Sequence, residues 1–181
     1  MTRDAPAASA IPWHALYTRS RHEKKVAALL ERRGYEAYLP LVPRESQWHD
    51  RKKVVEWPLF PGYVFARFRS SEAGAVLGTP GVASLVGIDG TPAEIPAEEI
   101  ENVRALAAAV ARTGSVPRPE PLMERGQTVR VLEGPFRGVR GILIEQRGDR
   151  ITLQVGLTAI RQAIRLEVGV TSVRAERERS A

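Results

Sequence analysis

The stretch Pro58–Phe68, PLFPGYVFARF, carries four aromatic rings and a single charge, that of Arg67. Successive side chains of a β-strand point to opposite faces of the sheet, so this strand offers apolar surface on both sides. One face of the strand packs into the protein core, and we assign Val64, Ala66 and Phe68 to this face. The opposite face, which includes Tyr63 and Phe65, needs a second partner.

The composition of the chain predicts a folded protein with a polyanionic partner. Its 181 residues have room for one domain of ordinary size or two small ones, and its formal net charge is +6. A net positive charge favours a polyanionic binding partner such as nucleic acid. The chain has no cysteine, which predicts a cytoplasmic protein without disulfides or thiolate chemistry. No apolar run is long enough to span a membrane, and the N-terminus lacks the apolar core of a signal peptide.

The first half of the chain alternates strand and helix signals. We expect a disordered tail over 1–11, a strand over 13–18 and then a helix. Ser20 and Glu23 have capping-box spacing at its start, and Gly34 follows its last turn. The polar, basic segment 44–57 predicts a projecting hairpin. A short strand over 81–87 precedes a second amphipathic helix, which Gly114 ends and whose Glu98, Glu99 and Glu101 complement the helix dipole.

The segment 115–121, SVPRPEP, divides the chain, because its alternate prolines exclude a helix or a sheet centre. Beyond it the apolar pattern changes to period two, with Gly148-Asp149 as a tight turn. Five short strands within the segment that follows the linker predict a small closed barrel, because closure leaves no exposed strand edges. The predicted fold class is α+β, with one domain over 12–114, a linker over 115–121 and a β-barrel over 122–176.

The residues give little support to catalysis. The histidines, His14, His22 and His49, have no companion at the spacing of metal ligands. There is no phosphate-binding glycine loop and no serine elbow. We therefore expect a protein that is not an enzyme and that needs no cofactor or metal.

Three stretches resemble one family, the NusG transcription elongation factors. WHALYTRSRHEKKV is similar to the opening strand and helix of that family, and LFPGYVFARF with TPGVASLVG resembles two segments of its N-terminal (NGN) domain. GQTVRVLEGPFRGVRGILIE is similar to the KOW motif of its C-terminal barrel. The resemblance covers about 12–173 and implies an NGN α/β sandwich with a mainly antiparallel sheet, followed by a five-stranded SH3-like KOW barrel. The pattern WHDRKKVVEWPLFPGYVF looks nearer to the specialised RfaH and UpxY-like antiterminators than to the housekeeping protein.

The resemblance answers what the second face of the strand is for. An exposed apolar patch of the family's NGN domain binds the clamp helices of the RNA polymerase β′ subunit and holds the clamp closed. By resemblance, the patch positions here are Tyr17, Phe60, Pro61, Tyr63 and Phe65. Because sheet cores also use aromatic residues, burial of Phe60 and Phe65 in the core is the competing interpretation.

Cations at two places are expected to lie near upstream DNA and the displaced non-template strand. The first group follows the opening strand: Arg19, Arg21, His22, Lys24 and Lys25. The second group, Arg51, Lys52 and Lys53, lies on the predicted hairpin and faces either nucleic acid or the polymerase. Such cations neutralise phosphates without reading sequence, and a solvated charged face is the alternative.

The remaining partner sites also follow from the resemblance. RfaH touches the β-subunit gate loop through threonines, which are missing at the corresponding Glu72, Ala73 and Gly74; this argues against a strong gate-loop contact. The family's barrel binds the ribosomal protein NusE or the termination factor Rho. The corresponding residues are Phe136, which we expect to be buried at the barrel mouth, and the loop residues Thr158, Ile160 and Arg161. Ile160 replaces an aromatic ring of NusG.

Two further expectations complete the hypothesis. The strands around 157–168 are rich in β-branched residues, so we expect a constitutive monomeric barrel rather than one that changes to helix. The alternative function is an RNA- or ribosome-binding protein that uses its KOW barrel. It predicts that affinity depends on Arg130, Arg137 and Arg140.

Overall fold

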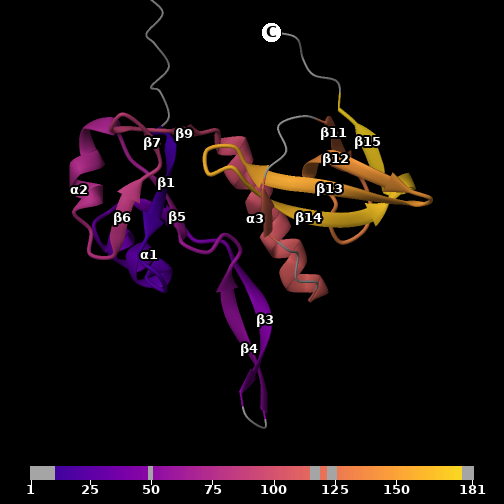
Figure 1. The fold of residues 1–181 in the computed structure, drawn as a ribbon, viewed down its shortest axis with the longest axis horizontal. Coiled ribbons are helices and arrows are strands. Elements are labelled where there is room, and N and C mark those ends of the chain that lie inside the picture. Colours follow the sequence, from indigo (N-terminus) through magenta and orange to yellow (C-terminus); the bar gives the residue numbers. More distant parts are fainter. Residues whose placement is uncertain (1–10, 49–50, 115–118, 122–125, 177–181) are drawn as a thin grey trace, which may run out of the picture.

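The computed structural model describes residues 11–48, 51–114, 119–121 and 126–176 (Figure 1). It has an N-terminal α/β part and a C-terminal β part, and helix α3 lies between them (Figure 1). The expected tail over 1–11 falls almost wholly outside the described residues, as do 115–118 of the expected linker. The predicted α+β class, with antiparallel sheets in both parts, is confirmed.

The N-terminal part is built on an antiparallel sheet in the order β2-β5-β1-β6, with β9 also paired to β1. The two central strands, β1 and β5, are in a register that places Tyr17 opposite Tyr63 and Leu16 opposite Val64. The strands are β1 Trp13–Thr18, β2 Glu36–Tyr38, β5 Tyr63–Arg67, β6 Val82–Leu85 and β9 Glu94–Ile95.

Both faces of β5 are buried inside the molecule. Val64, Ala66 and Phe68 pack with Val26 and Leu30 of helix α1, as the predicted core face requires. On the other face, Phe65 and Phe60 have no exposed surface and belong to the same apolar cluster as Ile100, Val103 and Leu106 of helix α3. The second partner of this strand is therefore α3 of the same chain.

Helix α1, Glu23–Arg32, begins without the predicted capping box. Its N-cap is His22, and the Glu23 carboxylate instead accepts a hydrogen bond from the Gly62 N–H at 2.9 Å. The capping-box prediction is wrong because the tertiary contact takes the carboxylate that the box needs. Gly34, at φ +87°, follows the helix as expected for a C-terminal stop.

The basic segment forms the predicted hairpin, which projects away from the sheet (Figure 1). Its strands are β3 Leu41–Trp48 and β4 Arg51–Pro58. Between β5 and α3 the chain forms small elements that the sequence did not reveal: η1 Ser70–Glu72, α2 Ala73–Leu77, β7 Gly87–Ile88 and β8 Thr91–Pro92.

Helix α3, Ala97–Thr113, is tied to the sheet by a stack of cations and aromatic rings. The Arg104 guanidinium lies 5.6 Å from the centre of the Trp13 ring and 4.8 Å from that of Tyr38. Glu36 of β2 pairs with both Arg104, at 3.5 Å, and Arg67, at 3.1 Å. These contacts fix the helix over the face that carries Phe65.

Burial of Tyr38 in this stack makes stability depend on pH. Burial, partly offset by Arg104, raises the pKa of Tyr38 from 10.0 to about 12. The phenol therefore ionises first in the unfolded chain, so its contribution to stability is complete below pH 10 and is lost as the pH rises toward 12.

We expect the free energy of unfolding to fall less steeply with pH in Tyr38→Phe than in wild type between pH 10 and pH 12. Urea titrations at several pH values, with Tyr35→Phe as control, measure this; identical slopes for wild type and Tyr38→Phe would contradict it.

The C-terminal part is one antiparallel sheet in the order β10-β14-β13-β12-β11-β15. Gly148 and Asp149 form the predicted tight turn between β12 and β13. Val129, Leu153 and Ile164 lie in the apolar core of the sheet. The strands are β10 Pro119–Pro121, β11 Gln127–Val131, β12 Arg140–Arg147, β13 Arg150–Leu157, β14 Gln162–Gly169 and β15 Val173–Ala175, with η2 Val170–Ser172 between the last two.

The last three residues of the expected linker are strand β10, paired antiparallel with β14. Proline cannot donate to a sheet ladder, and it is tolerated here because β10 is an edge strand. The C-terminal module therefore has a sixth strand that the sequence did not predict.

No helix among the described residues has the length and apolar character needed to cross a membrane.

Candidate functional site

Two tyrosine rings reach the surface as a pair on the two central strands of the N-terminal sheet. Tyr17 of β1 lies opposite Tyr63 of β5, and their ring centres are 5.4 Å apart in an edge-on arrangement. Tyr17 is 47% exposed, which is unusual for a ring on a central strand. The pKa of Tyr63 is raised, mainly by burial and then by the neighbouring Tyr17. Two amphipathic rings thus stand together at the surface.

A rigid turn supports this pair. The Gly62 N–H donates to Glu23, and the Gly62 carbonyl accepts from the Thr18 N–H at 2.8 Å. Gly62 has φ +84°, and a Cβ at this position would lie 3.1 Å from the Tyr17 ring. Only glycine combines this backbone conformation with so close a ring. The turn therefore fixes the positions of Tyr17 and Tyr63 in the unbound protein.

The five predicted patch residues divide into two layers. Phe60 and Phe65 are fully buried, with their rings edge-on at 6.3 Å, which agrees with the competing interpretation of both as core. Pro61 is exposed, and Tyr63 is partly exposed. We call Tyr17, Pro61 and Tyr63 the tyrosine patch; the two phenylalanines lie in the core rather than at the surface.

The predicted cations next to β1 gather around the start of α1. Arg19, Arg21 and Lys25 are exposed and have no ion pair with any described residue. Arg21 has φ +61°, a conformation that costs a residue with a Cβ about 1 kcal/mol or more. His22 is half-buried, and its Nδ1 lies 2.9 Å from the Ser20 carbonyl. These side chains place a group of cations at the surface beside the end of β1.

The hairpin continues the charged surface. Lys24 of α1 pairs with Glu56 of β4 at 3.5 Å, so the hairpin base is tied to the cations of α1. Lys52 pairs with Glu45 at 3.6 Å, whereas Lys53 is exposed. The side chain of Arg51 lies outside the described part of the structure.

The hairpin also exposes apolar surface. Trp57 is 44% exposed and lies under the Arg44 guanidinium, which is 5.1 Å from the ring centre. Val54 is 64% exposed. A surface that combines a stacked ring with lysines suits a phosphate-bearing partner.

The segment at the position of the gate-loop contact is helical. Glu72 ends η1, and its carboxylate accepts the Arg69 N–H at 2.8 Å. Ala73 and Gly74 begin α2. This turn presents small and acidic side chains, and the expectation that a strong gate-loop contact is missing stays a prediction.

The four predicted partner residues of the barrel lie at the end nearest to α3. Phe136 and Ile160 are buried, at 8% and 7% exposure. Thr158 is bound by Glu99 of α3, which accepts from its N–H at 3.0 Å and from its hydroxyl at 2.8 Å. Arg161 is exposed and has φ +52°. The loop that we expected to bind a separate protein is thus in contact with a helix of its own chain.

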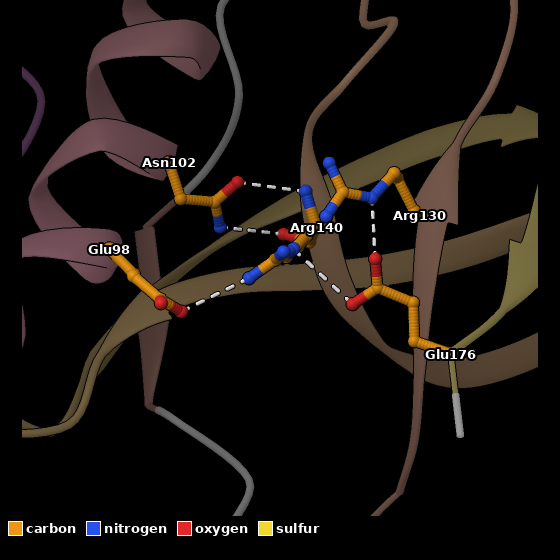
Figure 2. A network of polar contacts seen from close by, with 5 residues as sticks. All are labelled: Glu98, Asn102, Arg130, Arg140 and Glu176. Carbon is orange, nitrogen blue, oxygen red and sulfur yellow. Dashed lines mark hydrogen bonds and ion pairs between the residues drawn. The ribbon is translucent and has the colours of Figure 1, made fainter. Parts of the chain in front are cut away.

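Sequence reasoning missed the residues of α3 that hold the barrel. Asn102 exchanges two hydrogen bonds of 2.8 Å with the backbone of Arg140, and Glu98 pairs with the Arg140 guanidinium at 3.2 Å (Figure 2). The acidic residues had been assigned to the helix dipole alone. A signal was available in the run 105–111, ALAAAVA, because a helix that is apolar on most sides is covered by more than one neighbour.

The arginines of the alternative function are engaged by carboxylates. Glu176 bridges Arg130 and Arg140, and Arg140 also reaches Glu98 (Figure 2). Arg137 is exposed. Two of the three cations proposed to bind RNA are therefore already paired within the chain.

The chemistry of these surfaces is that of binding. No group of three potential metal ligands occurs among the described residues. The tyrosine patch offers ring faces and phenol hydroxyls, and the neighbouring cations offer charge. Together they suit a large macromolecular partner.

Comparison with known proteins points to one family. The family model "NusG: Transcription termination factor nusG" matches residues 12–104. The transcription termination/antitermination protein NusG of Pseudomonas aeruginosa is 31% identical over 175 residues, which cover 89% of this chain and 96% of that protein. The protein of the same name from Thermus thermophilus is 27% identical over 180 residues, covering 90% and 97%. A solved structure described as "Domain interaction in Thermotoga maritima NusG" is 22% identical with a TM-score of 0.47, covering 90% of this chain and 96% of that one.

Proposed function

This chain belongs to the NusG family of transcription factors, and from that premise we propose that it is an elongation and antitermination factor that binds RNA polymerase. Its N-terminal domain binds the clamp helices of the β′ subunit through the tyrosine patch. The protein acts by binding in the cytoplasm, as a monomer and without catalysis. It favours the closed, elongating clamp over the paused state, as any ligand does that prefers one conformation.

The observation that carries the proposal is the exposed pair Tyr17 and Tyr63 on its rigid turn. Tyrosine is enriched among the residues that dominate protein interfaces, since it buries a large ring and still satisfies its hydroxyl. Because the turn at Gly62 already fixes both rings, little conformational freedom is lost on binding. Tyr63 also packs against the apolar cluster that contains the buried Phe60 and Phe65.

The cations beside the tyrosine patch fit a polymerase that is bound to DNA. We propose that Arg19, Arg21, His22, Lys24 and Lys25 contact phosphates of the upstream duplex or of the non-template strand. Lys52 and Lys53 of the hairpin extend this surface, with Arg51 assigned from the sequence alone. Contacts of this kind add affinity without sequence preference and weaken with salt.

Arg21 gives a sharp test of the nucleic-acid contact. We expect Arg21→Gly to raise the free energy of unfolding by about 0.5 kcal/mol, because glycine adopts the positive φ without a Cβ penalty. The same change should lower the slope of log K against log salt for a forked DNA by about 0.9, the loss of one phosphate contact. Urea unfolding and fluorescence titration measure the two effects. Arg21→Lys keeps the charge and should keep the slope; an unchanged slope in Arg21→Gly would remove Arg21 from the DNA surface.

We propose that the C-terminal barrel binds a second partner protein while the N-terminal domain is bound to RNA polymerase. By family resemblance that partner is the ribosomal protein NusE or the termination factor Rho, and the contact residues are Phe136, Thr158, Ile160 and Arg161. Phe136 and Ile160 are buried, whereas Thr158, which donates to Glu99 of α3, and Arg161 are exposed. Tethering the barrel to a polymerase-bound domain raises the effective concentration of its partner.

Reconstitution from purified components tests the proposal. The full chain should co-purify with core RNA polymerase and should shorten the dwell time of polymerase at a pause site. The alternative function predicts instead that the chain associates with RNA or ribosomes through Arg130, Arg137 and Arg140 and does not retain polymerase. Retention of ribosomes without polymerase would overturn the proposal.

A further inference from the structure

The two faces of the β3–β4 hairpin carry different chemistry. Successive residues of a strand point to opposite faces, and residues directly paired across two strands share a face. By this pairing, the described side chains of one face that reach the surface are Arg44, Ser46, Lys53, Val55 and Trp57. We call this face the tryptophan face.

The opposite face holds the acidic side chains of the described part of the hairpin, and both of them are paired. The Glu45 carboxylate lies 3.6 Å from the Lys52 ammonium of the same face. The Glu56 carboxylate lies 3.5 Å from the Lys24 ammonium of α1, so this face is turned toward α1 at the base of the hairpin. The tryptophan face is therefore a separate surface from the cations at the start of α1.

The tryptophan face carries positive charge that no carboxylate of the same face balances. Its charged side chains among the described residues are Arg44 and Lys53, which are both exposed. Neither of them forms an ion pair with another described residue. The hairpin projects from the N-terminal sheet (Figure 1). A polyanion can therefore approach this face from solvent.

Trp57 adds an aromatic surface to these cations. It is 44% exposed, although tryptophan is highly buried on average. The Arg44 guanidinium lies 5.1 Å from the ring centre, within the range of a cation–π contact, which orients the indole. Unstacked bases stack on aromatic rings and on guanidinium planes. The bases of a duplex already stack on one another, so a single strand is the nucleic acid that this ring fits.

The surroundings of Trp57 favour nucleic acid over a protein as its partner. The centre of a protein interface usually combines an aromatic anchor with further apolar contacts that exclude water. Val54, the most exposed apolar side chain of the described hairpin at 64%, lies on the opposite face. Val55, on the tryptophan face, is only partly exposed. A ring flanked by unpaired cations instead matches the surfaces that bind single strands.

We propose that the tryptophan face binds single-stranded nucleic acid, with one base stacked on Trp57 and neighbouring phosphates on Arg44 and Lys53. Such contacts use neither base edges nor sugar hydroxyls, so the face accepts DNA and RNA of any sequence. This inference goes beyond the proposed function, which gives the hairpin phosphate contacts alone. It rests on that function for the presence of nucleic acid beside the bound chain.

The first arm of the test measures binding of the full chain to labelled oligo(dT), oligo(rU) and a DNA duplex, without polymerase. We expect Trp57→Leu to weaken binding of both single strands about tenfold or more and to leave duplex affinity unchanged. Trp57→Tyr keeps a ring and should stay within about threefold of wild type. Val54→Ala, on the opposite face, is the matched control and should change nothing.

Three results of this arm would overturn the inference. The first is a wild-type chain that binds neither single strand. The second is a Trp57→Leu chain that unfolds in urea like wild type and keeps its single-strand affinity. The third is an equal loss for duplex and single strands, since a duplex offers no free base to the ring.

The second arm identifies the source of the strand in an assembled elongation complex. A photoreactive thiolated base is placed in the displaced DNA strand of one complex and in the transcript of another. Crosslinks to β3 or β4 from either strand, reduced in Trp57→Leu, support the inference and show which strand is bound. A bound chain that gives no crosslink from either strand would contradict it. A chain that does not retain polymerase would refute the proposed function and leave the result of the first arm intact.

Discussion

Replacing both Tyr17 and Tyr63 by alanine is expected to lower the affinity for core RNA polymerase by about 100-fold or more. The two rings are the exposed pair at the centre of the tyrosine patch, and their turn is already ordered. Ring truncation at the centre of an interface commonly costs about 2 kcal/mol or more, and neighbouring losses are not additive. A combined loss of about 3 kcal/mol corresponds to the expected change in affinity.

The measurement is a titration of labelled full-length chain with core polymerase, alongside circular dichroism and a urea unfolding curve. Because Tyr17 is 47% exposed and Tyr63 is partly exposed, the double variant should remain folded. Leu77→Ala/Ile88→Ala is the control, since these apolar side chains are 46% and 79% exposed but lie outside the patch. A folded Tyr17→Ala/Tyr63→Ala chain with wild-type affinity would show that the tyrosine patch does not bind polymerase.

Phe65→Ala is expected to lower the free energy of unfolding by about 3–5 kcal/mol. Phe65 has no exposed surface and lies in the apolar cluster that joins β5 to α3, edge-on to Phe60. Removing the ring leaves a cavity that the sheet and helix cannot close without separating from their other contacts. The loss is a large share of the 5–15 kcal/mol that stabilises an ordinary domain.

Urea unfolding of the full chain measures this loss, and Phe65→Leu is the matched variant. Leucine fills most of the volume and should cost well under half as much. Phe65→Leu should also keep polymerase binding, because Phe65 is buried and does not face the partner. A Phe65→Ala chain that loses less than about 1 kcal/mol would mean that α3 does not depend on this ring.

The alternation in Pro58–Phe68 predicted which residues share a face but not what covers each face. Val64, Ala66 and Phe68 were assigned correctly to the core. Phe65 was expected at a surface because an apolar face shows only that something covers it, whether a partner or another part of the chain. That distinction depends on where α3 returns in space, which local periodicity does not contain.

The start of α1 shows how a tertiary contact overrides a local signal. Ser20 and Glu23 have the right spacing for a capping box, yet Glu23 binds the Gly62 N–H instead. That bond links two segments 39 residues apart and supports the tyrosine patch. The local motif was therefore present in the sequence, but a distant donor used its carboxylate.

The acidic start of α3 was the most consequential omission of the sequence reasoning. Glu98 and Glu99 suit the positive end of the helix dipole, and this explanation appeared sufficient. Their contacts with the barrel depend on how the two parts of the chain are placed, which no pattern within either part encodes. Asn102 carried a second local hint beside the apolar run 105–111, since an amide within an apolar helix usually has a hydrogen-bond partner.

The identity of the polymerase element that meets the tyrosine patch is the most direct test of the proposed function. A photo-crosslinking amino acid replaces Tyr63 in the full chain, and a second chain carries it at the exposed Ile88 as a control. After irradiation with core polymerase, mass spectrometry identifies the crosslinked peptide. Crosslinks from position 63 to the β′ clamp helices, absent from position 88, are the predicted result. Crosslinks from position 63 to another polymerase element, or none from a chain that still binds polymerase, would contradict docking through the tyrosine patch.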